Sequence, residues 1–247
     1  MSATEGRWWA KALLVGAVIA VVALPLGALG SRLGIWPFTG GFLLLAVGVV
    51  LATIVFFLGL IGAVYIHVKG GGADRTRCLI GVAISVVILG LMGNQFMQAQ
   101  SVPPIHNIST DTQDPPAFDK IIAIRAQVAG NNPEAYDASK LAEQQRAAYP
   151  YVKPLVSPRA PTVLFGQAQA AMEGMGLEIV NSDANRGIIE ATDTTFWFGF
   201  KDDVVVRIRP EGNGSVLDIR SVSRVGQSDL GKNAQRIGQI LNALGTD

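Results

Sequence analysis

The fold is decided by a stretch near the end of the chain, Arg220-Ser-Val-Ser-Arg-Val-Gly-Gln-Ser-Asp-Leu-Gly-Lys-Asn-Ala-Gln-Arg-Ile237. Its first half alternates serine and arginine with the period of two that is typical of a β-strand. Gly226 permits a sharp turn, Ser228 can cap a helix, and Asp229 would be the first residue of that helix. The stretch therefore predicts a strand that runs into a closing helix, which we expect to reach Leu244 and to pack on a sheet.

The residues before this stretch predict an antiparallel meander. Its expected segments are Leu177–Val180, Ile188–Thr195, the aromatic run Phe196–Phe200, Asp203–Arg209 and Ser215–Arg224. The turn Gly212-Asn-Gly214 joins the last two strands and places Arg207 opposite or diagonal to Asp218. Helices are predicted over Asp137–Ala148 and Thr162–Met175. The carboxyl-terminal part is thus expected to be an α+β domain with about four to five strands, packed by helices.

The amino-terminal part has a different composition. Of the 247 residues, 49% are hydrophobic and only 16% are charged, which is too apolar for an average soluble protein. Residues 8–29, 42–66 and 78–97 are each long and apolar enough to cross a bilayer. A cleaved signal peptide is the alternative for the first stretch, but its apolar run is longer than usual and further spans follow.

These features predict three parts of the chain. Residues 1–98 form a membrane domain with three transmembrane helices, residues 99–118 a Pro-rich linker, and residues 119–247 an extracytoplasmic α+β domain. The linker contains two Pro-Pro pairs and is expected to be extended. Its apolar residues Ile105, Ile108 and Phe118 could dock on the surface of the domain.

Basic residues near the predicted spans indicate an orientation. Lys and Arg accumulate on the cytoplasmic side of short flanks. One side of the predicted bundle carries Arg7, Lys11, Lys69, Arg75 and Arg77, whereas the other carries Arg32 alone. We therefore expect a multi-pass protein of the bacterial inner (cytoplasmic) membrane, with a cytoplasmic amino terminus and a periplasmic carboxyl-terminal domain.

Arginine is concentrated on one face of the predicted sheet. That face would carry Arg207, Arg209, Arg220 and Arg224, together with the acidic residues Asp203 and Asp218. One interpretation is a ladder of salt bridges, each of which contributes little. The other is a surface for an anionic group, because arginine binds phosphate and carboxylate with two parallel hydrogen bonds. A lipid headgroup or another envelope component would suit such a surface.

Composition argues against several other classes of function. The net charge of +1 gives no general attraction to nucleic acid. One cysteine and two histidines do not suggest a metal centre, and we expect no metal and no cofactor. The second and third spans carry no Asp, Glu, Lys or Arg in their interiors, so an ion pathway through them has no visible residues.

Several blocks of the carboxyl-terminal part resemble a known family. They are Pro104–Asp111, Pro115–Phe118, Ile189–Thr192, Phe198–Arg207 and Arg220–Ile237. Together they resemble the bacterial and plastid family called domain of unknown function 1499, over about residues 102–245. The resemblance implies a small α+β domain, often behind amino-terminal membrane spans. It implies no established activity and no cofactor.

The sequence favours a binding or assembly module of the cell envelope. We expect its partners to be the lipid bilayer and either an anionic lipid or an envelope protein, with no nucleic acid. No residue is assigned as catalytic. The candidate ligand-binding residues are Arg207, Arg220, Arg224, Asp229, Asn233, Arg236 and His106.

Two alternatives stay open at this point. The first is an envelope enzyme, such as a hydrolase, that uses His106 with Asp111, Asp202 or Asp203. That hypothesis requires the imidazole and a carboxylate to meet in one pocket. The second is a purely structural role, which would be favoured if the arginines are all paired within the protein and no cleft exists.

Overall fold

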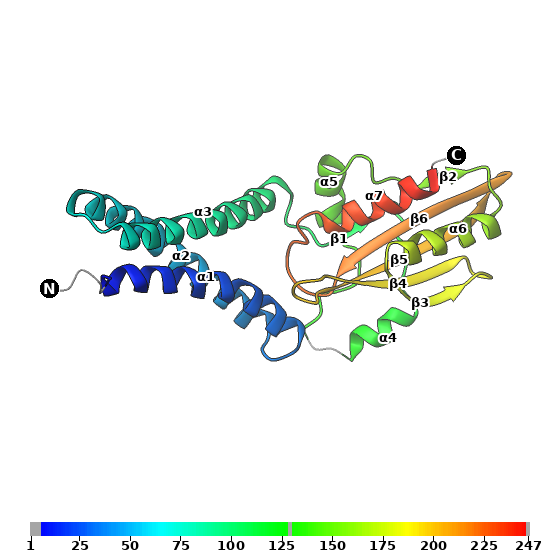
Figure 1. The fold of residues 1–247 in the computed structure, drawn as a ribbon. Coiled ribbons are helices and arrows are strands. Elements are labelled where there is room, and N and C mark those ends of the chain that lie inside the picture. The colour runs from blue at the N-terminus through cyan, green and yellow to red at the C-terminus, as the bar shows by residue number, and fades with distance from the viewer. Residues whose placement is uncertain (1–5, 128–129, 246–247) are drawn as a thin grey trace. The chain divides into compact units, whose positions relative to one another are not determined.

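A computed structural model describes residues 6–127 and 130–245 of the chain (Figure 1). These residues divide into two compact units. The first comprises Met1–Ala99 with Phe196–Gly199, and the second comprises Gln100–Thr195 with Phe200–Asp247. The first unit is built from long helices, and the second is built around a sheet.

The first unit contains three helices that are long and apolar enough to cross a membrane. They are α1 (Trp8–Arg32), α2 (Phe38–Lys69) and α3 (Gly72–Ser101). Small residues let these helices approach closely. A β-carbon on Gly27 of α1 would lie 2.7 Å from the carbonyl oxygen of Gly41 in α2. A β-carbon on Gly59 would lie 2.8 Å from the side chain of Val82 in α3, so neither glycine has room for a larger residue.

The second unit is organised around one antiparallel sheet. Its strands are β1 (Asn107–Ser109), β2 (Leu155–Ser157), β3 (Glu178–Asp183), β4 (Ile188–Thr194), β5 (Lys201–Glu211) and β6 (Gly214–Ser223). The order is β1-β6-β5-β4-β3, and β2 also pairs with β6. Strands β3 to β6 form the meander that the sequence predicts. The predicted architecture, three apolar helices followed by an α+β domain, is confirmed.

Strands β1 and β2 come from segments where the sequence predicts an extended chain but no strand. Both pair with the same edge of β6. Asn107 lies opposite Val222, and Leu155 lies opposite Leu217. Part of the Pro-rich linker is therefore built into the sheet, and Ile105 and Ile108 are buried in the main core.

Helices cover both faces of the sheet. They are α4 (Lys120–Ala126), α5 (Ala138–Ala148), α6 (Pro161–Gly174) and α7 (Lys232–Gly245). Helices α6 and α7 pack on one face, where Val204, Val206 and Ile208 enter the main core (Figure 1). On the other face, Val205 packs with Phe118 and with α4. The arginine-bearing face is thus covered by α4 and by the end of the Pro-rich segment.

Candidate functional site

Arg207 and Arg209 of β5 share one buried carboxylate, that of Asp218 on β6. The Nη2–Oδ2 distances are 3.1 Å from Arg207 and 2.8 Å from Arg209. The predicted register is confirmed, because Arg207 lies directly opposite Asp218. Asp114 also receives both arginines, at 2.9 and 3.4 Å, and Asp111 lies at 3.7 and 3.9 Å. Two guanidinium groups are therefore balanced by three carboxylates, in a cluster that ties the Pro-rich segment to the sheet.

Arg224 is held by the buried carboxylate of Asp203. Its Nε and Nη2 donate to the two carboxylate oxygens at 2.9 and 2.7 Å, which is the bidentate geometry of a strong ion pair. Arg125 of α4 donates to the same carboxylate at 2.6 Å, and Thr192 donates at 2.9 Å. Since Asp203 is fully buried, this cluster links α4, β4 and β5 beneath the surface.

Arg220 is 4% exposed and has only neutral hydrogen-bond partners among the described residues. Its Nε donates to the Asn107 side chain at 3.0 Å, and its Nη1 donates to the carbonyl of Pro116 at 3.1 Å. The guanidinium lies over the ring of Phe118, 5.2 Å from its centroid. Burial lowers the pKa of Arg220 to about 10. The side chain therefore fastens β1 and the Pro-rich segment onto β6.

The closing helix begins later than the sequence predicts. The prediction that it begins at Asp229 is wrong, because α7 begins at Lys232. Leu230 and Gly231 have φ values of 55° and 79°, which break the helical path. The Asp229 carboxylate instead accepts the backbone N–H groups of Gly231 at 2.8 Å and of Asn233 at 2.7 Å. Burial raises the pKa of Asp229, while these hydrogen bonds oppose that effect.

Arg236 uses all its hydrogen-bond donors within the protein. Its Nε donates to Asp193, its Nη2 donates to Asp193 and Asp202, and its Nη1 donates to Ser221 and Asn233. These bonds are 2.6 to 3.1 Å long. A guanidinium carries five N–H donors, so Arg236 has none left for a ligand. It fixes α7 to the ends of β4, β5 and β6.

Asn233 and His106 meet at the start of α7. The Asn233 amide is fully buried and donates to the backbone carbonyl of His106 at 2.9 Å and to the Ser223 hydroxyl at 3.0 Å. The His106 ring itself is only half-buried, and its Nδ1 lies 3.4 Å from the carbonyl of Gln227. The structure thus brings together Asn233 and the backbone, rather than the ring, of His106.

Asp111 is remote from His106 along the sheet. The carbonyl of His106 accepts the N–H of Ser223, whereas the residue before Asp111 donates to the carbonyl of Ile219. Four residues of β6 separate these two contacts, which is about 13 Å at the usual rise of a strand. An imidazole and a carboxylate so far apart do not form one catalytic pair.

Asp202 and Asp203 do not complete such a pair either. As neighbours on β5 they point to opposite faces, where Asp202 binds Arg236 and Asp203 binds Arg224. Within residues 6–127 and 130–245, no ion pair joins His106 to a carboxylate. No described contact therefore joins the His106 ring to a carboxylate of the hydrolase hypothesis.

An open cleft lies beside α7, with a volume of about 500 Å³. It is lined by Met175, Leu177, Asp193, Lys232, Gln235, Arg236, Gln239 and Ala243. Exposed polar side chains of α7 form one wall, whereas Met175 and Leu177 provide apolar surface. We call this site the α7 cleft. Its volume lies within the range of small-molecule sites.

Sequence reasoning missed two members of the arginine–carboxylate clusters, the cation Arg125 and the carboxylate Asp193. Arg125 lies on a short helix, and Asp193 lies at the end of a strand, so neither shows a motif. Tyr149 is also buried without a hydrogen-bond partner for its hydroxyl among the described residues, and burial raises its pKa to about 12. No group of three or more His, Cys, Asp or Glu in the described part of the chain is placed to hold a metal ion.

Comparison with known families gives one match. Residues 107–244 match the family described as "Protein of unknown function (DUF1499)". The match covers more than half of the 247 residues, runs from β1 into the last turn of α7, and leaves the three apolar helices outside. The resemblance seen in the sequence is thereby confirmed. No curated protein matches the chain.

Proposed function

We propose, for a chain that belongs to the DUF1499 family of proteins of unknown function, that its sheet domain is a membrane-anchored binding module with the α7 cleft as its ligand site. The observation that carries this proposal is the cleft itself, which combines apolar surface with exposed hydrogen-bonding groups. Ligand sites commonly combine these two features. The proposed setting is the cell envelope, with the domain on the periplasmic side of the inner membrane.

Lys232 gives the cleft one cationic group that could bind an anionic group of a ligand. Asp193 already receives two hydrogen bonds from Arg236. Lys232 is exposed and forms no ion pair within residues 6–127 and 130–245. Gln235 and Gln239 follow it on the same face of the helix, at spacings of three and four residues. A carboxylate or phosphate, including that of a lipid headgroup, could be bound by this ammonium and the two amides.

The candidate residues have different parts in this proposal. Asp229, Asn233 and Arg236 fix the start of α7 and so position the polar wall of the cleft. Direct binding of an anion by His106 or by the three arginines of the sheet stays a prediction. Since Arg207 and Arg224 are held in ion pairs, such binding would require those pairs to open.

The proposal can be tested by filling the cleft. The full chain would be extracted into lipid nanodiscs directly from its native membrane, and retained anionic molecules would be identified by mass spectrometry. Gln239 lines the cleft, whereas Asn242 is exposed on the same helix outside it. We expect the wild type and Asn242→Trp to retain an anionic species that Gln239→Trp and Lys232→Gln lose.

Two outcomes separate the possibilities. Loss of the species only from the cleft variants, with unchanged thermal unfolding, supports the proposal. An identical set of retained molecules in all four proteins would refute the assignment of the α7 cleft. A combined Arg207→Ala, Arg220→Ala and Arg224→Ala variant that stays folded and loses the species would move the site to the arginine-bearing face.

A further inference from the structure

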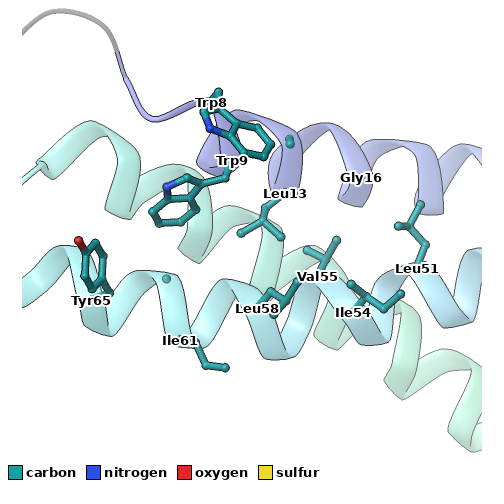
Figure 2. Close-up of a pocket in the computed structure, with 12 residues that line it drawn as sticks. Trp8, Trp9, Leu13, Gly16, Leu51, Ile54, Val55, Leu58, Ile61 and Tyr65 are labelled. Atoms are coloured by element: carbon teal, nitrogen blue, oxygen red, sulfur yellow. The ribbon is translucent and has the colours of Figure 1, made fainter.

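A second cavity lies between α1 and α2, at the end of the helical unit where α1 begins. Its volume is about 610 Å³, and Figure 2 shows the side chains around it. Trp8, Trp9 and Tyr65 surround one end, whereas Gly16 and Leu51 mark the other. All of its lining residues belong to the two helices. We call this cavity the α1–α2 groove.

The groove is lined by small and large apolar residues of both helices. Ala12 and Gly16 lie on one wall. A β-carbon on Gly16 would lie 3.2 Å from Val55, so α1 and α2 approach closely at this end of the groove. Across the groove, Ile61 and Tyr65 are 66% and 51% exposed. Side chains this apolar and this exposed need a covering that is itself apolar.

The groove is longer than the hydrocarbon part of one bilayer leaflet. Its lining on α2 runs from Leu51 to Tyr65, which is about 21 Å of helix at the usual rise of 1.5 Å per residue. The hydrocarbon core of a bilayer is about 30 Å thick, so one leaflet contributes about half of that. A chain that enters at Tyr65 would reach the bilayer midplane within the groove.

Positive charge gathers at the aromatic end. Lys11 and Lys69 lie about one helical turn from Trp8 and Tyr65. The guanidinium of Arg7 lies over the Tyr65 ring, 5.9 Å from its centroid. This end of the unit carries Arg7, Lys11, Lys69, Arg75 and Arg77, against Asp74 as the one acidic residue among described residues 6–101.

Asp74 does not neutralise the lysines. Its carboxylate receives Arg77 at 2.6 Å and the backbone N–H of Arg7 at 2.9 Å. Lys11 and Lys69 are exposed and form no ion pair within the described part of the chain. Their ammonium groups are therefore available to a phosphate beside the groove. Aromatic rings with nearby Lys and Arg are also typical of the bilayer interface.

We propose that the α1–α2 groove binds one acyl chain of a phospholipid whose anionic headgroup lies beside Lys11 and Lys69. This inference rests on the three helices crossing a bilayer, and it is independent of the α7 cleft. A phospholipid satisfies both parts of the site, since its chain covers the apolar wall and its phosphate meets the ammonium groups. A soluble anion would leave the apolar wall uncovered.

Tryptophan fluorescence can report occupancy of the groove. Replacement of Trp36 and Trp197 by phenylalanine leaves Trp8 and Trp9 as the tryptophans of the full chain. The protein would be placed in phosphatidylcholine vesicles with rising fractions of acyl-brominated phosphatidylglycerol or acyl-brominated phosphatidylcholine. We expect half-maximal quenching at a fraction of brominated phosphatidylglycerol that is about fivefold lower than the fraction of brominated phosphatidylcholine. This is the effect of about one favourable contact between a basic side chain and an anionic lipid.

Two matched variants assign the quenching to the groove. Ala12 lines the groove, whereas Val18 is exposed on the same helix outside it. Ala12→Phe should abolish the preference for the anionic lipid, and Val18→Phe should keep it. In the double variant Lys11→Gln and Lys69→Gln, the quenching curve for phosphatidylglycerol should coincide with that for phosphatidylcholine. The acyl-chain contact remains in this variant, whereas the contact with the anionic headgroup is lost.

Other results would overturn the proposal. If the quenching curves for the two lipids coincide in the protein with an unaltered groove, the groove is covered by surrounding lipid without selectivity for the anionic headgroup. Weak quenching that rises as the protein is diluted in lipid would show that a second copy of the chain covers the groove. If the phenylalanine background does not fold, native mass spectrometry decides the question. Equal retention of phosphatidylglycerol by the wild type, Ala12→Phe and Val18→Phe would then overturn it.

Discussion

Arg236 and Lys232 lie one turn apart on α7 but differ in what their N–H groups already bond. Arg236 donates five hydrogen bonds to four neighbours, two of which are carboxylates. Lys232 is exposed beside the cleft, and its ammonium donates one hydrogen bond, to the Gln235 side chain at 3.4 Å. The sequence shows that both residues are cations. It does not show that the N–H donors of Arg236 are all used, because this depends on Asp193 and Asp202, which lie on strands of the sheet. A residue that the sequence suggests as a ligand contact, such as Arg236, can thus position the site instead of binding the ligand.

Replacement of Arg236 should therefore affect stability. Arg236→Gln leaves Asp193 and Asp202 without their cation, and loss of one partner from a buried ion pair costs about 3–5 kcal/mol. Arg186→Gln is a matched control, because Arg186 pairs with Asp119 at 59% side-chain exposure. That change should cost about 0–1 kcal/mol. The measurement is the opening free energy of α7 and β6 amides from native-state hydrogen exchange. Equal costs for the two variants would contradict the support role.

Among the elements, strands β3 to β6 are predictable because each is long enough to show alternation. The Gly212-Asn-Gly214 turn then determines the register of β5 and β6. Strands β1 and β2 have three residues each, which is too short for a periodic pattern. They form because the edge of β6 away from β5 is free to pair with them. That edge exists only once the whole sheet has formed, so local sequence does not predict β1 and β2. Likewise, α4 covers the arginine-bearing face through Arg125 and Asp203, a pair that is 78 positions apart in the chain.

The start of α7 gives a prediction at the level of an element. Asp229 accepts two backbone N–H groups there, whereas Ser228 accepts that of Leu230 in an exposed position. Asp229→Ala should destabilise the domain by about 1 kcal/mol, the usual cost of a lost helix cap, and Ser228→Ala should cost less. Thermal unfolding of both variants measures the difference. A larger effect of Ser228→Ala would show that Asp229 does not cap α7.

At the scale of the whole molecule, the chain combines a family domain with three apolar helices outside the family match. The charges near those helices are uneven. The start of α1, the end of α2 and the start of α3 carry five basic residues, whereas the end of α1 carries Arg32. This asymmetry supports the proposed orientation, with the amino terminus in the cytoplasm.

The orientation can be measured by cysteine labelling in intact cells whose outer barrier has been opened. The native Cys78 is buried, so it should react little. Ala73→Cys lies beside the α2–α3 connection and should react with a membrane-impermeant maleimide only after the inner membrane is permeabilised. Asn242→Cys, on the sheet domain, should react before permeabilisation. The reverse pattern would place the domain in the cytoplasm.

The pairing of β1 and β2 with one edge of β6 has a practical consequence. Together they occupy the hydrogen-bonding groups of β6 on the side away from β5. A shortened protein that starts after Ser109 would lack β1 and would expose part of that edge. The fragment would also lose Ile105 and Ile108 from the main core. Exposed strand edges recruit other strands, so such a fragment should self-associate. The smallest soluble version of the domain therefore has to retain residues that, in the sequence, read as a linker.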